Sequence, residues 1–254
     1  MRGAPSLEGS LRAALTATIL VGTWAAGSEL ARSPLLPGPL EVARALASAL
    51  AAGTLARAVA VSAVRLLVGY AIAIATGVPL GLLLARSDAT KRALGPLLLG
   101  LSSVPSICWL PLAIVWFGLS EAAIQVVVVL GAALPVTLAT ESSVRQLPPS
   151  VERAARTMGA RGATLVFRVL LPASMPGIVT GAKMGWTFAL RSLMAGELLF
   201  VSGGLGQLLE TGRDLADTAL VLGVVAVIVV LSRASERALF APLDRAIARR
   251  WGTS

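Results

Sequence analysis

The chain reads Val151-Glu-Arg-Ala-Ala-Arg-Thr-Met-Gly-Ala-Arg-Gly-Ala-Thr-Leu-Val-Phe-Arg-Val-Leu-Leu-Pro172 between two long apolar runs. This stretch is charged and rich in helix-forming residues, whereas the sequence on either side of it is strongly hydrophobic. A polar segment of this length in so apolar a chain predicts a loop with a role of its own. The alternative is an ordinary connector whose charges lie at lipid headgroups.

The local sequence predicts two short helices in this loop. Ser150 is a candidate N-cap for the first helix, and Glu152 in its first turn suits the helix dipole. Ala154, Ala155 and Met158 give that helix a small, smooth face, to which another protein can approach closely, while Arg153 and Arg156 remain solvated.

A turn and a second helix are expected after this first helix. Gly159 permits a sharp turn, Ala160 and Arg161 follow it, and the second helix is expected to run to Leu170. Pro172 then opens the next apolar run, where its missing N–H is harmless.

Composition places the protein in a membrane. Of the 254 residues, 56% are hydrophobic and 14% are charged, whereas soluble domains are about 45–50% apolar and roughly a quarter charged. The net charge of +9 raises the possibility of nucleic-acid binding. However, the basic residues lie between apolar runs and aromatic residues for base stacking are few, so no nucleic-acid partner is expected.

The sequence contains no histidine and a single cysteine. Sites with histidine ligands and catalysis by a histidine acid or base are therefore excluded. No metal site, no cofactor and no catalytic residue is expected in the chain. An intramembrane enzyme is disfavoured because no nucleophile–base pair is evident.

Hydropathy predicts an all-α, polytopic membrane protein. A spanning helix needs about 20 apolar residues, and about six segments qualify: 13–31, 58–85, 93–118, 121–141, 173–200 and 217–235. Residues 33–57 open with prolines and continue as a short amphipathic helix expected at the outer interface. The predicted organisation is an N-terminal part, 1–57, and a core, 58–250, that contains the polar loop 142–172.

The distribution of basic residues predicts the orientation. With the N-terminus inside, Arg32, Arg44, Arg57, Arg65 and Arg213 face outward. The larger inward set is Arg2, Arg12, Arg86, Lys91, Arg92, Arg145, Arg153, Arg156, Arg161, Arg168, Arg233, Arg237, Arg245, Arg249 and Arg250. By the positive-inside rule, both termini are cytoplasmic.

Several residues are candidates for lining a solute pathway. The run Ser102-Ser-Val-Pro-Ser-Ile-Cys-Trp-Leu-Pro111 interrupts the third span, and a broken helix at membrane depth needs protein or water to satisfy its backbone. Ser103, Ser106 and Trp109 are therefore pathway candidates, with a packing kink as the alternative. Trp186 is a further candidate. Small residues at Gly77, Gly81, Gly181 and Gly185 suit close packing of helices.

Charges in the fifth span complete the candidate set. Charged groups in a span are costly, so they are expected to be functional or paired. Arg191 has the planar fork that suits a sulfonate, nitrate or carboxylate. The alternatives are that it pairs with Glu197 or extends toward the surface. Because these two residues are six apart on one helix, a partner across a dimer is favoured. Lys183 is interpreted as structural.

Several motifs resemble the permease subunits of ABC importers for nitrate, taurine and aliphatic sulfonates. The matching stretches are Leu36-Pro-Gly-Pro-Leu-Glu-Val, Ser62-Ala-Val-Arg-Leu-Leu-Val-Gly69, Gly77-Val-Pro-Leu-Gly-Leu-Leu-Leu84, Trp109-Leu-Pro-Leu-Ala-Ile-Val-Trp-Phe-Gly118 and the polar loop. The resemblance covers residues 35–250. It implies the type I importer permease fold, a bacterial plasma (inner) membrane location and a multi-pass topology.

The resemblance also implies partners and roles. The loop residues Glu152, Arg153, Ala154, Ala155, Met158, Gly159 and Ala160 would couple the permease to two ATP-binding subunits, which hold ATP and Mg. A second permease copy, forming a homodimer, and an extracytoplasmic solute-binding protein would complete the complex. The chain would carry a small anion by alternating access and would not itself hydrolyse ATP. The loop departs from the family at Arg153, where the usual residue is Glu; Glu152 lies one residue earlier, about 100° around the helix.

A self-sufficient channel or secondary transporter is the rival interpretation. It would leave the polar loop as a plain connector that tolerates rewriting. The small number of ionisable groups in the spans argues against it, because proton-coupled carriers need titratable relays.

Overall fold

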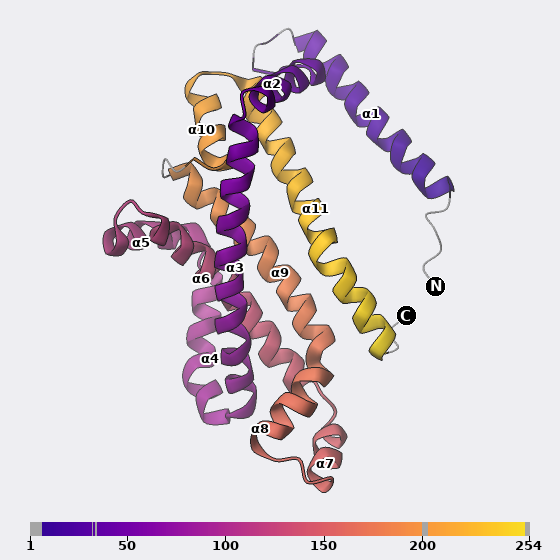
Figure 1. Ribbon diagram of the computed structural model, residues 1–254, viewed down its shortest axis with the longest axis vertical. Coiled ribbons are helices and arrows are strands. Elements are labelled where there is room, and N and C mark those ends of the chain that lie inside the picture. Colours follow the sequence, from indigo (N-terminus) through magenta and orange to yellow (C-terminus); the bar gives the residue numbers. More distant parts are fainter. Residues whose placement is uncertain (1–6, 32, 34, 200–202, 252–254) are drawn as a thin grey trace. The chain divides into compact units, whose positions relative to one another are not determined.

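The computed structural model describes residues 7–31, 33, 35–199 and 203–251 (Figure 1). Within these residues the chain is helical and no strand is present. The elements are α1 (Leu7–Ala31), α2 (Pro39–Ala51), α3 (Thr54–Arg86), α4 (Asp88–Ser103), η1 (Ser106–Trp109), α5 (Leu110–Phe117), α6 (Glu121–Arg145), α7 (Pro149–Thr157), α8 (Gly162–Leu165), the π-helix η2 (Val166–Leu170), α9 (Leu171–Leu199), α10 (Leu205–Asp214) and α11 (Thr218–Trp251).

Four helical stretches of the described chain are long and apolar enough to cross a membrane: α3, α6, α8 through α9, and α11. A fifth crossing results if α4 and the η1–α5 segment form one bent span. These account for five of the six predicted spans and confirm an all-α membrane protein. The remaining segment, 13–31, forms α1 but is not among the candidate spans.

The chain divides into two compact units. One comprises residues 1–61 with 203–231, and the other comprises residues 62–202 with 232–253. In the first unit, α2 forms where a short amphipathic helix was predicted. The Glu41 carboxylate accepts a hydrogen bond from the Gly38 N–H at 3.0 Å, which satisfies a donor at the start of the helix. In the second unit, α6 and α9 pack along their length.

The predicted interruption of the third span is confirmed. The helix α4 ends at Ser103, and the axis bends by 101° before α5. Pro105 occupies the break, and the 3-10 turn η1 joins the two parts. Since Pro lacks an N–H and disfavours helical backbone before it, the helix cannot continue through this point.

The loop 142–172 has the predicted two-helix form, with one correction at its start. The first helix begins at Pro149, so the expected N-cap Ser150 lies inside the first turn. The physical reason is that the fixed φ of proline already suits the first helical position. Gly159 has φ +88°, which confirms the sharp turn. The second helix, α8, continues as a π-helix into α9.

Glycines on α9 allow α6 to approach closely. A Cβ at Gly181 would lie 2.2 Å from the Ala139 Cβ, and one at Gly185 would lie 2.6 Å from a Val136 methyl. On the other side of α6, a Cβ at Gly81 of α3 would lie 2.5 Å from the Thr137 carbonyl oxygen. The expectation of close packing at these glycines is therefore confirmed.

We expect Gly181→Ala to destabilise the protein, because the added methyl forces α6 and α9 apart. Overpacking of this kind costs about 1–3 kcal/mol. Gly100→Ala on α4 is the matched control, since a Cβ there meets nothing within 4 Å. Thermal unfolding of both variants in detergent measures the difference. Equal melting temperatures for the two variants would contradict the close contact.

Candidate functional site

A cavity of about 300 Å³ lies beside the break between α4 and α5. It brings together three of the predicted pathway residues, Ser103, Ser106 and Trp109. The remaining lining comes from the rest of the break, from α6 and from one aromatic residue of α9: Ser102, Val104, Pro105, Leu130, Gly131, Leu134, Pro135 and Phe188. The bend of the chain thus opens a space with hydroxyl groups and aromatic rings on its walls.

A hydroxyl contact between the break and α9 holds two walls of this cavity together. Ser192 Oγ of α9 lies 2.7 Å from Ser106 Oγ and 2.8 Å from the Phe188 carbonyl oxygen. A Cβ at Gly131 of α6 would lie 2.1 Å from Ser192 Oγ, so only glycine permits this approach. The hydroxyl bridge therefore ties the non-helical break to α9.

Arg191 contacts Phe188, one of the residues that line the cavity. Its guanidinium carbon is 5.8 Å from the centre of the Phe188 ring, a cation–π distance. Arg191 is exposed, and the structure does not pair it with Glu197. An exposed guanidinium beside an aromatic wall can form hydrogen bonds to an oxyanion.

Glu197 has a different environment from Arg191. Its side chain is buried, with 1% exposed. Arg65 Nη1 of α3 donates to Glu197 Oε1 at 2.9 Å, and the Ser62 hydroxyl donates to Oε2 at 2.7 Å. The partner of Glu197 thus lies in the same chain, not across a dimer as was favoured from the sequence.

Arg65 also contacts a second carboxylate, that of Glu121 at the start of α6. Arg65 Nε donates to Glu121 Oε2 at 2.6 Å, and a second bond joins Arg65 Nη2 to Oε1. Gln125 Nε2 donates to the Arg65 carbonyl oxygen at 3.2 Å. One guanidinium therefore joins α3, α6 and α9. Sequence reasoning missed Arg65 because it was counted as an outward-facing charge, although it lies in an apolar run as Arg191 does.

Trp186 lies in the core and not at the cavity. It is 3% exposed, and its ring meets Tyr70 edge-on at 5.0 Å between centroids and Phe240 at 6.3 Å. Its Nε1 donates to Ser235 Oγ at 3.2 Å. This aromatic cluster joins α9 to α3 and α11. Lys183 pairs with Asp244 at 2.6 Å, in agreement with a structural role.

The predicted coupling residues are divided between a buried and an exposed side of the loop. Ala155 is 1% exposed and packs in a cluster with Leu82, Val144, Leu165 and Leu170. Ala160 packs against the same cluster. Arg153, Ala154 and Gly159 are exposed, and Met158 is 81% exposed. Figure 1 shows α7 and α8 at one end of α6 and α9.

Glu152 is half-buried on the core side of α7. It lines a 220 Å³ pocket together with Arg145, Leu147 and Pro149, among others. Its Oε1 accepts from Arg156 Nη2 at 2.6 Å and Nε at 3.0 Å. The carboxylate is therefore paired within its own helix.

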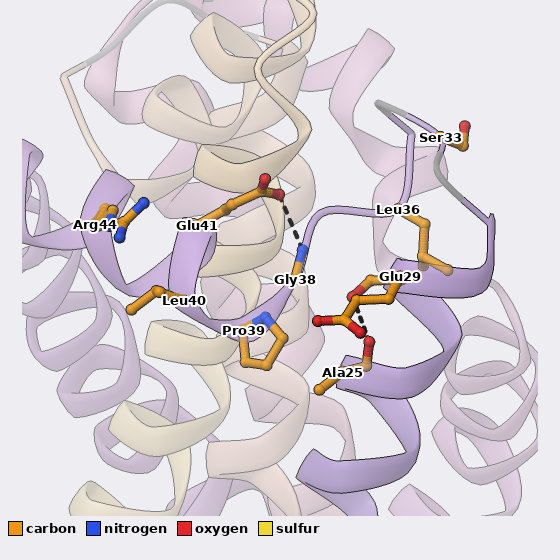
Figure 2. A pocket seen from close by; sticks show the side chains of 10 residues that line it. Ala25, Glu29, Ser33, Leu36, Gly38, Pro39, Leu40, Glu41 and Arg44 are labelled. Atoms are coloured by element: carbon orange, nitrogen blue, oxygen red, sulfur yellow. Dashed lines mark hydrogen bonds between the residues drawn. The ribbon is translucent and has the colours of Figure 1, made fainter.

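A larger cleft of about 750 Å³ lies between α1 and α2 in the first unit (Figure 2). Figure 2 shows Glu29, Glu41 and Arg44 around it, together with Ser33 and Gly38. The Glu41 carboxylate caps α2, and Glu29 and Arg44 are exposed. None of the predicted site residues lies there. In the described residues, no group of His, Cys, Asp or Glu side chains could hold a metal ion.

We expect Arg65→Met to destabilise the protein by about 3–5 kcal/mol, because it leaves Glu197 as a buried charge without its guanidinium. The double variant Arg65→Met/Glu197→Leu should recover much of the loss, since an apolar pair can replace a buried ion pair. The melting temperatures of the single and the double variant in detergent measure the loss and the recovery of stability. Arg213→Met, which removes an exposed pair with Glu210, is the control and should change little. If the double variant is less stable than Arg65→Met, the unpaired charge of Glu197 is not the cause of the loss of stability.

Comparison with known proteins gives consistent matches. Residues 77–240 match the family model described as binding-protein-dependent transport system inner membrane component. A protein of Methanocaldococcus jannaschii, named as an ABC transporter permease, is 31% identical over 75% of this chain and 72% of its own. The taurine transport system permease protein TauC of Escherichia coli is 28% identical over 85% of this chain and 81% of its own.

The fold also matches a solved structure. A chain of the MetNI methionine ABC transporter, in an inward-facing conformation, superimposes with a TM-score of 0.69. The match covers 76% of this chain and 96% of that chain at 24% sequence identity. At this identity the likeness concerns the fold alone.

Proposed function

Because the chain belongs to the family of binding-protein-dependent transport system inner membrane components, the permeases of ABC importers, we propose that it translocates a small anion by alternating access. A binding protein delivers the solute, and two ATP-binding subunits drive the change from inward-facing to outward-facing. ATP is hydrolysed in those subunits. The permease acts as a homodimer in a bacterial plasma membrane, with both termini in the cytoplasm.

The loop 149–170 is the observation that carries this proposal. Its inner side is packed on the ends of α3, α6 and α9 through Ala155, Leu165 and Leu170. On its outer side, Met158 is 81% exposed and Phe167 is 63% exposed. A segment that is fixed to the spanning helices and exposes apolar side chains can transmit a rigid-body movement from a partner to the core. A plain connector needs neither property.

The cavity at the break supports the proposal that the solute is an anion. Arg191 lies against Phe188, which lines the cavity, and Ser103 and Ser106 supply hydroxyl groups to the cavity wall. A sulfonate fits such a set, because guanidinium and hydroxyl donors suit its oxygens while the aromatic walls accept its apolar part. The relative named for taurine transport supports the same substrate class.

Co-purification tests the subunit assignment. We expect an ATP-binding subunit to co-purify with the tagged protein from its own membranes in mild detergent, as identified by mass spectrometry. Replacement of residues 150–160 by a flexible polar linker should abolish this association. A protein recovered alone, and still conducting or exchanging solute in liposomes, would favour a channel or carrier.

We expect Gly159→Leu to uncouple ATP hydrolysis from uptake, because the loop needs a left-handed residue at its turn. Gly53→Leu is a matched control, since Gly53 also has a positive φ, +75°, and open space at its Cβ. Both substitutions impose similar strain of about 1–2 kcal/mol, but only the first is in the loop. ATPase activity and uptake in proteoliposomes are measured together. Normal uptake by Gly159→Leu would contradict the coupling role.

We expect Arg191→Leu to weaken uptake of a sulfonate, measured with labelled taurine, by about tenfold or more, as a charged hydrogen bond to the solute is lost. Arg92→Leu, which removes an exposed charge from α4, should leave uptake unchanged. If the Arg191→Leu variant takes up taurine with the same kinetics as the unmodified protein, Arg191 has no part in the pathway.

A further inference from the structure

The positive-inside rule accounts for the many arginines of the loop 149–170, but it does not say which of the charges in the loop face outward. Glu152 is the one acidic residue of this stretch, whereas Arg153, Arg156, Arg161 and Arg168 are basic. All four arginines are exposed. The loop therefore presents a positive surface to any partner.

The direction of each charge follows from the anchoring of α7. Ala155 is the buried residue of this helix, and successive residues are about 100° apart around the axis. Glu152 precedes Ala155 by three residues and so lies within about 60° of it, on the core side. Arg153 lies about 160° from Ala155, on the opposite side of the helix. The Glu152 side chain, which is 41% exposed, therefore lies on the side of α7 nearer the core, and the Arg153 side chain lies on the outer side.

The pairing within the loop strengthens this division. Glu152 accepts two hydrogen bonds from Arg156, so its charge is neutralised within the helix. In the part of the chain that the structure describes, no ion pair is formed by Arg153, Arg161 or Arg168. These exposed guanidinium groups lie on the same loop as the exposed side chains of Met158 and Phe167.

We propose that the ATP-binding subunit meets this surface with a carboxylate of its own, an Asp or Glu opposite Arg153, at the edge of an apolar groove that receives Met158. This inference rests on the proposed function and adds the chemistry of the partner's surface. The contact is a bidentate guanidinium–carboxylate pair in which the permease supplies the cation. Since Glu152 lies on the side nearer the core and is paired with Arg156, the permease contributes the cation of this contact.

Affinity measurements on the complete permease in nanodiscs test the inference. The probe is the purified ATP-binding subunit that co-purifies with the permease. We expect Arg153→Glu to weaken its binding by about 30-fold or more, since two carboxylates would then face each other. The Arg153→Lys permease keeps the positive charge and should bind the ATP-binding subunit more tightly than the Arg153→Glu permease does. Arg92→Glu makes the same change of net charge on α4 and should bind as the unmodified protein does.

A second-site experiment identifies the partner residue. Substitutions of single Asp and Glu residues of the ATP-binding subunit to Lys are combined with Arg153→Glu. One of them should restore binding to the Arg153→Glu permease and weaken binding to the unmodified one. Because Arg153 is exposed, the melting temperature of Arg153→Glu should remain unchanged, which separates lost contact from misfolding.

The outcomes distinguish the two proposals. If no ATP-binding subunit binds the unmodified permease, the proposed function fails. If the subunit binds the unmodified permease and Arg153→Glu equally well, the function stands and the carboxylate contact is overturned. The carboxylate contact is also overturned if no Asp or Glu substitution in the ATP-binding subunit restores its binding to the Arg153→Glu permease.

Discussion

The close approach of α6 to its neighbours is the constraint on which the rest of the core depends. Helices in a membrane gain little from hydrophobic association, so van der Waals contact between smooth surfaces must hold them together. Gly181 and Gly185 of α9 lie against one side of α6, and Gly81 of α3 lies against another. With bulkier residues the helices would separate. The hydroxyl bridge from Ser192 to the break could not form, and Arg65 could not reach carboxylates on α6 and α9 at the same time.

Charges in this core divide into two groups with different physical roles. Arg65 and Glu197 are buried and paired, and each is costly to leave alone, so together they fix the relative positions of three helices. Arg191 is exposed, its guanidinium carbon lies 5.8 Å from the centre of the Phe188 ring, and within the described residues it forms no ion pair. A guanidinium that is not held by a carboxylate remains available to an anionic solute. Burial and pairing thus separate a structural charge from a candidate binding charge on one helix, although the sequence presents both as charges in a span.

The loop 149–170 combines firm attachment with an exposed surface. Its apolar residues are continuous with a buried cluster at the ends of α3, α6 and α9, so a force on the loop acts on all three helices. The turn at Gly159 sets the direction of the first helix relative to the second. The same anchoring decides which charges face outward. Arg153 lies on the outer side of α7 because Ala155 is held on the core, and Glu152 lies nearer the core for the same reason.

Local features of the sequence determined the helical membrane class, the break at Pro105, the turn at Gly159 and the two-helix form of the loop. These depend on hydropathy and on the backbone restrictions of Pro and Gly, which act over a few residues. The helix starts at Pro149 and not after Ser150 because the preset backbone of proline outweighs side-chain capping at this position. Only the tertiary structure decided that Glu197 pairs with Arg65, that Trp186 packs in an aromatic cluster, and that Ser103, Ser106 and Trp109 meet Phe188 at one cavity. Such contacts join residues far apart in the chain. They depend on the rotation and height of each helix against its neighbours, which a hydropathy pattern does not specify.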